Sequence, residues 1–174
     1  MDAYKKKFVI GIDPGRNGGI VGLTNGNINI IGKMPLQPSD IWGYFADDLG
    51  IPLIGKENIH VFIEDVHSMP TDGVRSAFSF GKHLGWLDML LAYYRLDTTR
   101  VLPAKWQNSF GLSRKESRTS TKYEYKKHIR DKALLLVPQS HQKEITLATC
   151  DAYLIALWGF NQLKEQHENQ TKSW

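Results

Sequence analysis

Three segments of the sequence carry carboxylates where metal-dependent chemistry could occur. Asp13 follows a short apolar run, Glu64 and Asp65 follow a second one, and Asp151 lies inside a long apolar run near residue 155. Carboxylate oxygens are hard ligands suited to Mg²⁺ or Mn²⁺. Two such ions about 4 Å apart can activate a water and stabilise the leaving oxygen in an in-line attack on a phosphodiester.

Each carboxylate also has an ordinary structural explanation. Asp13 precedes Pro14-Gly15 and could simply cap a turn. Glu64 and Asp65 could be solvated residues at a strand end, and they must point to opposite faces because side chains alternate along a strand. Alternation alone does not choose between them. Asp151 is harder to explain, because a carboxylate on a buried helix is costly unless it is paired, protonated or bound to metal.

The elements expected to position these residues alternate between strands and helices. Apolar runs rich in Val, Ile and Phe predict strands, and Asn25-Gly26 predicts a hairpin turn between two of them. The expected strands are 7–12, 20–23, 27–31, 59–66 and 98–102. Apolar residues at helical spacing predict helices at 39–49, 74–94, 103–107, 122–136 and 145–163.

Length and composition favour one domain over residues 1–174, large enough to bury a core without disulfides. The single cysteine, Cys150, indicates a reducing, intracellular compartment. The apolar runs are far shorter than a membrane span, so the sequence predicts a soluble protein.

The positive charge is concentrated in residues 105–132. This segment holds nine Lys and Arg against three acidic residues, whereas the other residues hold thirteen basic and fifteen acidic groups. Such localisation is typical of a surface that binds a polyanion. Within it, four basic residues spaced by four form a stripe along the expected helix: Arg118, Lys122, Lys126 and Arg130. A solvated helix face is the alternative explanation.

Three motifs resemble the active-site motifs of RuvC-type Holliday-junction resolvases, in matching order and spacing. They are Ile-Gly-Ile-Asp13-Pro-Gly, Ile-Glu64-Asp-Val and Cys-Asp151-Ala-Tyr-Leu-Ile-Ala. The segments Gly81-Lys-His-Leu-Gly85 and Val101-Leu-Pro103-Ala-Lys-Trp106 are also similar to segments of phage and bacterial members. The resemblance extends from about residue 7 to residue 160.

This resemblance implies an α/β fold of the ribonuclease-H-like type. We expect a five-stranded mixed sheet, with its first three strands antiparallel, flanked by helices. The family further implies a two-fold homodimer, two divalent metal ions per active site (Mg²⁺ or Mn²⁺), and paired nicking of four-way DNA junctions. A member of it would be a cytoplasmic protein, encoded by a bacterium or a phage.

The resemblance selects Glu64 over Asp65 and assigns Asp13, Glu64 and Asp151 as catalytic metal ligands, with Asp13 bridging both ions. His67 matches a position that probes bases at the junction centre, although it could be an ordinary loop histidine. The expected DNA-binding residues are His67, Lys105, Arg114, Lys115, Arg118, Lys122 and Lys126. Many resolvases have a fourth ligand one turn before the helix aspartate, where this sequence has Ala148. Glu144 is a possible substitute.

Three other functions compete with this one. An actin-like or sugar-kinase ATPase also opens with a strand, an acidic residue and a glycine turn, but it needs two such domains. A ribonuclease H or transposase-like nuclease would share the carboxylates and act on branched DNA or an RNA–DNA hybrid. A catalytically silent junction-binding protein is the alternative that is not an enzyme. Trp106 is expected in the core, and a base-stacking platform is its alternative role.

Overall fold

A central sheet organises the computed structural model, which describes residues 8–67, 73–112 and 121–172. Its five strands lie in the order β3-β2-β1-β4-β5. They are β1 (Phe8–Asp13), β2 (Gly19–Thr24), β3 (Asn27–Lys33), β4 (Ile59–Glu64) and β5 (Asp97–Val101). Strand β2 is antiparallel to both β1 and β3, while β1, β4 and β5 run parallel. This sheet confirms the predicted fold class, a ribonuclease-H-like α/β fold whose first three strands are antiparallel.

The predicted hairpin joins β2 and β3. Asn25 and Gly26 have φ values of 50° and 81°. Positive φ at both central residues is the requirement of the tight turn that matches the twist of paired strands, and Asn-Gly satisfies it at low cost.

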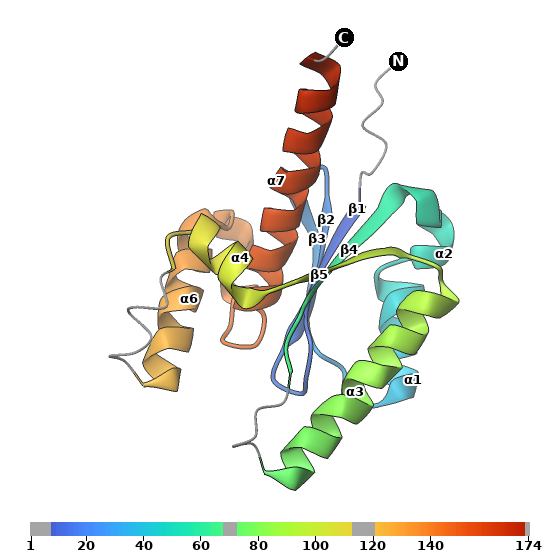
Figure 1. The fold of residues 1–174 in the computed structure, drawn as a ribbon, viewed down its shortest axis with the longest axis vertical. Coiled ribbons are helices and arrows are strands. Elements are labelled where there is room, and N and C mark those ends of the chain that lie inside the picture. Colours follow the sequence, from blue (N-terminus) through green and yellow to red (C-terminus); the bar gives the residue numbers. More distant parts are fainter. Residues whose placement is uncertain (1–7, 68–72, 113–120, 173–174) are drawn as a thin grey trace.

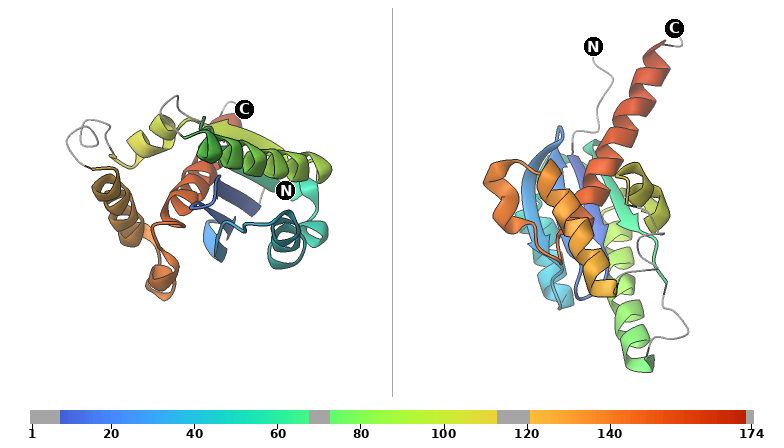
Figure 2. Two further views of the ribbon diagram at one scale, coloured as in Figure 1. Left: turned by 90° about the horizontal axis from the view of Figure 1, so that it is seen from below. Right: turned by 90° about the vertical axis from the view of Figure 1, so that its left-hand side faces the viewer.

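Helices cover both faces of the sheet (Figure 1). One face carries α4 (Pro103–Ser109), α6 (Lys122–Leu136) and α7 (Cys150–Lys172), and the other carries α1 (Pro38–Gly43), α2 (Ile51–Ile54) and α3 (Val74–Tyr93). The described residues also form three short helical segments: the π-helical η1 (Tyr44–Asp48) and the 3₁₀ turns η2 (Lys56–Asn58) and η3 (Gln139–Glu144). Helix α6 lies beside α7 in both figures (Figure 2).

Side-chain alternation along the strands builds two separate cores. Val9 and Phe62 pack with Trp106 and the first turns of α7, whereas Ile10 and Val61 pack in the second core on the opposite face of the sheet. Odd positions of β1 and even positions of β4 therefore face α7. Among the described residues, no helix is both long and apolar enough to cross a bilayer.

Two helices begin elsewhere than predicted. The helix expected from Ser39 begins at Pro38, because Pro fits the first turn of a helix, and its second half continues as a π-helix. The last helix begins at Cys150 rather than at residue 145. Its expected first turn is replaced by a non-helical turn, where the Thr149 hydroxyl accepts from the Thr146 N–H and donates to the Glu144 carbonyl. Such side-chain bonds compete with helical backbone bonds.

Candidate active site

The sheet places Asp13 and Glu64 at neighbouring strand ends. Strands β1 and β4 run parallel, with Ile12 opposite Ile63. Asp13 and Glu64, the next residues, therefore lie side by side at the ends of the two strands. Both carboxylates belong to the positions that face α7, and both are buried. Glu64 therefore shares the face of Asp13, and Asp65 does not. The Asp65 side chain is partly exposed, and its Oδ1 lies 3.8 Å from His67 Nε2.

Helix α7 brings Asp151 to the same place. Asp151 is in the first turn of α7, and this helix packs closely across β1. A Cβ atom at Gly11 would stand 2.3 Å from the Ala152 carbonyl oxygen and 2.5 Å from the Ala156 nitrogen. Only glycine permits this approach, so the backbone contact itself sets how near Asp151 comes to Asp13.

A lysine from the basic segment occupies the space between these two aspartates. Lys126 Nζ donates to Asp151 Oδ2 at 2.6 Å and to Asp13 Oδ2 at 3.3 Å. Lys126 comes from the second turn of α6, and 29 % of its side chain is exposed. Its ammonium therefore lies within the carboxylate cluster, and not only along an outer face of α6.

Burial and mutual repulsion shift the pKa values of this cluster. Burial, followed by the charge of Asp151, raises the pKa of Asp13 to about 7, although Lys126 opposes the shift. Burial and the charges of Asp13 and Asp151 raise the pKa of Glu64 to about 8, against the hydrogen bond from Trp106. For Lys126, burial lowers the pKa, but the two aspartates outweigh it and the net pKa is raised. A nearby positive charge is therefore required to stabilise the ionised forms of these carboxyl groups.

Two further donors hold the carboxylates in place. The Trp106 indole donates from Nε1 to Glu64 Oε1 at 2.8 Å, and both residues are buried. The Cys150 thiol donates to Asp151 Oδ1 at 3.2 Å. Burial, with the charge of Asp151, raises the pKa of this thiol, which keeps it protonated and able to donate. Trp106 thus belongs to the core, as expected, and also contacts the candidate site.

The donor set fits the chemistry of a hard divalent cation. Asp13, Glu64 and Asp151 offer only oxygen atoms, the ligands that Mg²⁺ and Mn²⁺ prefer. In the present side-chain arrangement, no three His, Cys, Asp or Glu residues of the described segments are close enough together to hold one ion. In this arrangement the Lys126 ammonium forms ion pairs with both Asp13 and Asp151.

Two further predicted site residues have other contacts. His67 follows β4 in the described loop, with 79 % of its side chain exposed and Nε2 3.8 Å from Asp65 Oδ1. Glu144 ends η3, where its carboxylate contacts His141 Nδ1 at 2.6 Å. Ala148 lies in the turn before α7, so it does not occupy the helical position one turn before Asp151.

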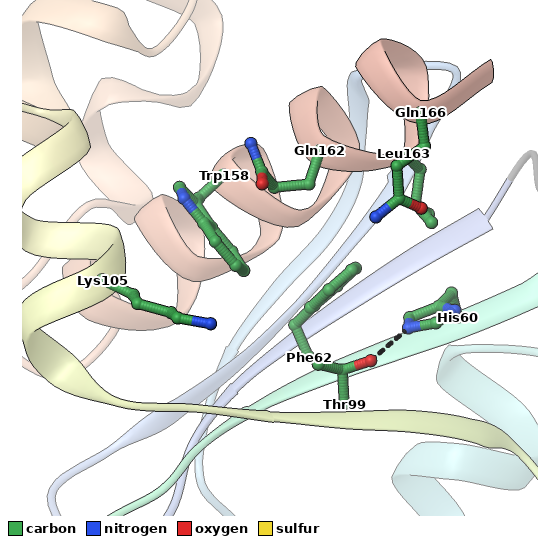
Figure 3. A pocket seen from close by; sticks show the side chains of 8 residues that line it. All are labelled: His60, Phe62, Thr99, Lys105, Trp158, Gln162, Leu163 and Gln166. Atoms are coloured by element: carbon green, nitrogen blue, oxygen red, sulfur yellow. Dashed lines mark hydrogen bonds between the residues drawn. The ribbon is translucent and has the colours of Figure 1, made fainter. Parts of the chain in front are cut away.

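The predicted DNA-binding lysines divide among three environments. Lys122 is exposed at the start of α6, while Lys126 points into the carboxylate cluster. Lys105, from α4, lines a separate cavity of about 470 Å³ between α7 and the edge of the sheet (Figure 3). Phe62 and Trp158 form its apolar wall, and His60 bonds to Thr99 within it. Arg114, Lys115 and Arg118 lie outside the described residues.

Sequence reasoning missed the two contacts that organise the site. The predicted core position of Trp106 does not include its bond to Glu64, and the predicted basic stripe places Lys126 on a DNA-facing surface. Asp151 lies in an apolar run with no Lys or Arg within the two helical turns that follow it, which indicated that a cation distant in sequence should pair with it. Lys126 pairs with residues 25 and 113 positions away. Sequence periodicity does not detect such pairs.

Comparison with known proteins identifies structural similarity alone. No family model matches the sequence, and no curated protein matches it. The solved structure of Thermus thermophilus RuvC in complex with a Holliday junction substrate is 16 % identical, with 89 % of this chain and 94 % of that chain covered and a TM-score of 0.49. A second T. thermophilus RuvC structure is 17 % identical, with 91 % and 96 % covered and a TM-score of 0.47. The fold assignment rests on the strand order and directions of this chain.

Proposed function

We propose that this chain is a metal-dependent, structure-selective DNA endonuclease that resolves four-way junctions by paired phosphodiester cleavage. The observation that supports this most is the grouping of Asp13, Glu64 and Asp151 from two parallel strand ends and one helix, on a single face of the sheet. The fold class, the ordered motifs and the localised basic segment agree with this activity.

In this proposal Asp13 would be shared by two Mg²⁺ or Mn²⁺ ions, and Glu64 and Asp151 would each help to hold one of them. When bound, the ions supply an activated water and stabilise the leaving oxygen. The side chains around them orient the ligands: Trp106 fixes one oxygen of Glu64, and Cys150 fixes one oxygen of Asp151. Hydrogen bonds of this kind commonly tune metal affinity and activity by 10- to 100-fold.

DNA binding is assigned to the basic segment 105–132 and to the exposed His67. Lys122 and the residues at 114, 115 and 118 would contact phosphates, and His67 would contact bases at the junction centre. The chain 1–174 would act as one nuclease domain in the cytoplasm of a bacterial cell, and a two-fold homodimer would present two sites to one junction.

A single cleavage comparison tests this function. A four-way junction, a plain duplex and an RNA–DNA hybrid of equal length should be incubated with the protein and Mg²⁺ under the same conditions. We expect paired nicks in the junction and little cleavage of the other two substrates. Asp13→Asn, Glu64→Gln and Asp151→Asn should each lose cleavage by more than roughly 100-fold while junction binding persists, because outer-shell changes alone cost 10- to 100-fold.

Other outcomes would identify the competing functions. Preferential cleavage of the hybrid would indicate a ribonuclease H, and tight junction binding without cleavage would indicate a silent binding protein. Near-normal cleavage by Asp151→Asn would contradict the assignment of α7 to the site.

A further inference from the structure

The ammonium of Lys126 lies between the buried carboxylates of Asp13 and Asp151. Its ammonium contacts Oδ2 of both Asp151 and Asp13, which come from different elements of the fold. These oxygens are among the atoms that the proposed function assigns to metal ions. An ammonium hydrogen-bonded to a carboxylate oxygen uses the lone pairs that a metal ion would use.

The electrostatics explain why a lysine is held there. Two buried carboxylates repel each other and lose hydration, so their proximity is unfavourable without a positive charge. Lys126 provides that charge from α6, which is anchored by buried Ile129 and Ala133. Its four-carbon stem can rotate away without movement of the helix, whereas a rigid guanidinium fork would not be released as readily.

We propose that Lys126 is a resident cation that positions Asp13 and Asp151 for metal, and that its ammonium leaves the two aspartates when a divalent ion binds. This inference rests on the proposed function, because it assumes that the carboxylates take metal. It assigns Lys126 a positioning role that differs from phosphate binding. The metal-free protein thereby keeps its metal ligands close together despite their repulsion.

The Mn²⁺ affinity of Lys126→Gln, compared with that of the wild type, provides the first test. Isothermal titration of Mn²⁺ into metal-free protein at about pH 8.5 should show tighter binding by Lys126→Gln than by the wild type. We expect about a tenfold difference, the equivalent of one charged hydrogen bond that no longer has to be broken. Lys127→Gln is the matched control, since Lys127 is exposed on the same helix, and its affinity should equal that of the wild type.

Amine labelling of the wild type provides a second test that needs no variant. An acylating reagent followed by peptide mass spectrometry should modify Lys126 several-fold more in saturating Mg²⁺ than in chelator. Lys122 and Lys127 should be modified equally in both conditions. Unchanged or reduced labelling of Lys126, equal or weaker Mn²⁺ binding by Lys126→Gln, or absence of Mn²⁺ uptake by both proteins would each overturn the inference.

Both measurements omit DNA, so they separate this inference from the proposed function. Tighter Mn²⁺ binding by the variant together with no junction cleavage by the wild type would leave the inference and remove the function. Equal Mn²⁺ binding by Lys126→Gln and the wild type, together with paired junction cleavage by the wild type, would support the proposed function and overturn the role of Lys126.

Discussion

The indole of Trp106 donates a hydrogen bond from Nε1 to Oε1 of Glu64 at 2.8 Å, and both side chains are buried. This bond joins the first helix after β5 to the carboxylate that ends β4. It fixes one Glu64 oxygen and leaves the other available. The orientation of a proposed metal ligand therefore depends on a core residue 42 positions away.

Trp106→Phe should remove this donor with little loss of packing. We expect cleavage to fall by roughly 10- to 100-fold, as for other residues that orient metal ligands. The free energy of unfolding should decrease by about 1–3 kcal/mol, because the buried Glu64 oxygen loses its partner. Single-turnover cleavage and chemical denaturation measure the two effects. Trp42→Phe, at an exposed tryptophan, is the control, and equal activity of the two variants would contradict the positioning role.

The metal-free protein should lose stability as the pH rises from about 4 to about 8. The folded-state pKa of Asp13 is raised from 3.8 to about 7, and that of Glu64 from 4.5 to about 8. Between the unfolded and folded values the folded state binds more protons, so the free energy of unfolding falls as pH increases and then levels off. Thermal unfolding in chelator across this range measures the effect.

Glu64→Gln isolates the Glu64 contribution to that pH dependence. The variant cannot ionise at this position, so its melting temperature should fall less than that of the wild type toward pH 8. A difference of about 1 kcal/mol corresponds to roughly 2–4 °C for a protein of this size. Parallel curves for the two proteins would contradict the raised pKa of Glu64.

Junction binding should depend on salt through the exposed lysines of α6. Lys122→Ala combined with Lys127→Ala should reduce the slope of log affinity against log salt by roughly two units, at about 0.9 for each lost phosphate contact. Fluorescence anisotropy across a salt series measures this slope. Lys56→Ala, at an exposed lysine of η2, should leave it unchanged. If the double variant behaved like this control, the α6 lysines would be an ordinary solvated face.

We expect the proposed homodimer to form through exposed apolar residues along one side of α3. Spacings of four and seven residues place Val74, Phe78, Gly85 and Met89 near one side of the helix, and Val74, Phe78 and Met89 are exposed. A Cβ atom at Gly85 would meet nothing within 4 Å, so a second backbone could approach there. Phe78→Glu should convert a dimer to a monomer in light scattering, whereas Leu135→Glu on α6 should not. A monomeric wild type would contradict this prediction.

Local sequence patterns predicted the sheet well because its signals are short-range. Val9 and Ile10 belong to an apolar run of strand length, and Asn25-Gly26 specifies its turn through backbone conformation alone. The choice between Glu64 and Asp65 was different. It depends on which face of β4 receives α7, a tertiary contact that alternation along one strand does not encode.

The start of α7 and the position of Lys126 were also beyond local patterns. An apolar run predicted a helix from residue 145, but the hydroxyl of Thr149 bonds to nearby backbone groups and delays the helix to Cys150. Lys126 has the same local spacing as a solvated residue of a basic stripe. Its contact with Asp13 spans 113 positions, and only the packing of α6 beside α7 creates it.

The close contact at Gly11 determines which parts of the site can move. Asp13 is two residues from Gly11, and Asp151 is next to Ala152, whose carbonyl lies against Gly11. Both aspartates are thus fixed to a backbone interface that resists local opening more than exposed segments do. The distance between them should vary little on the timescale of substrate exchange. If the site binds metal as proposed, it would adapt by side-chain rotation, and the flexible four-carbon stem of Lys126 allows such rotation.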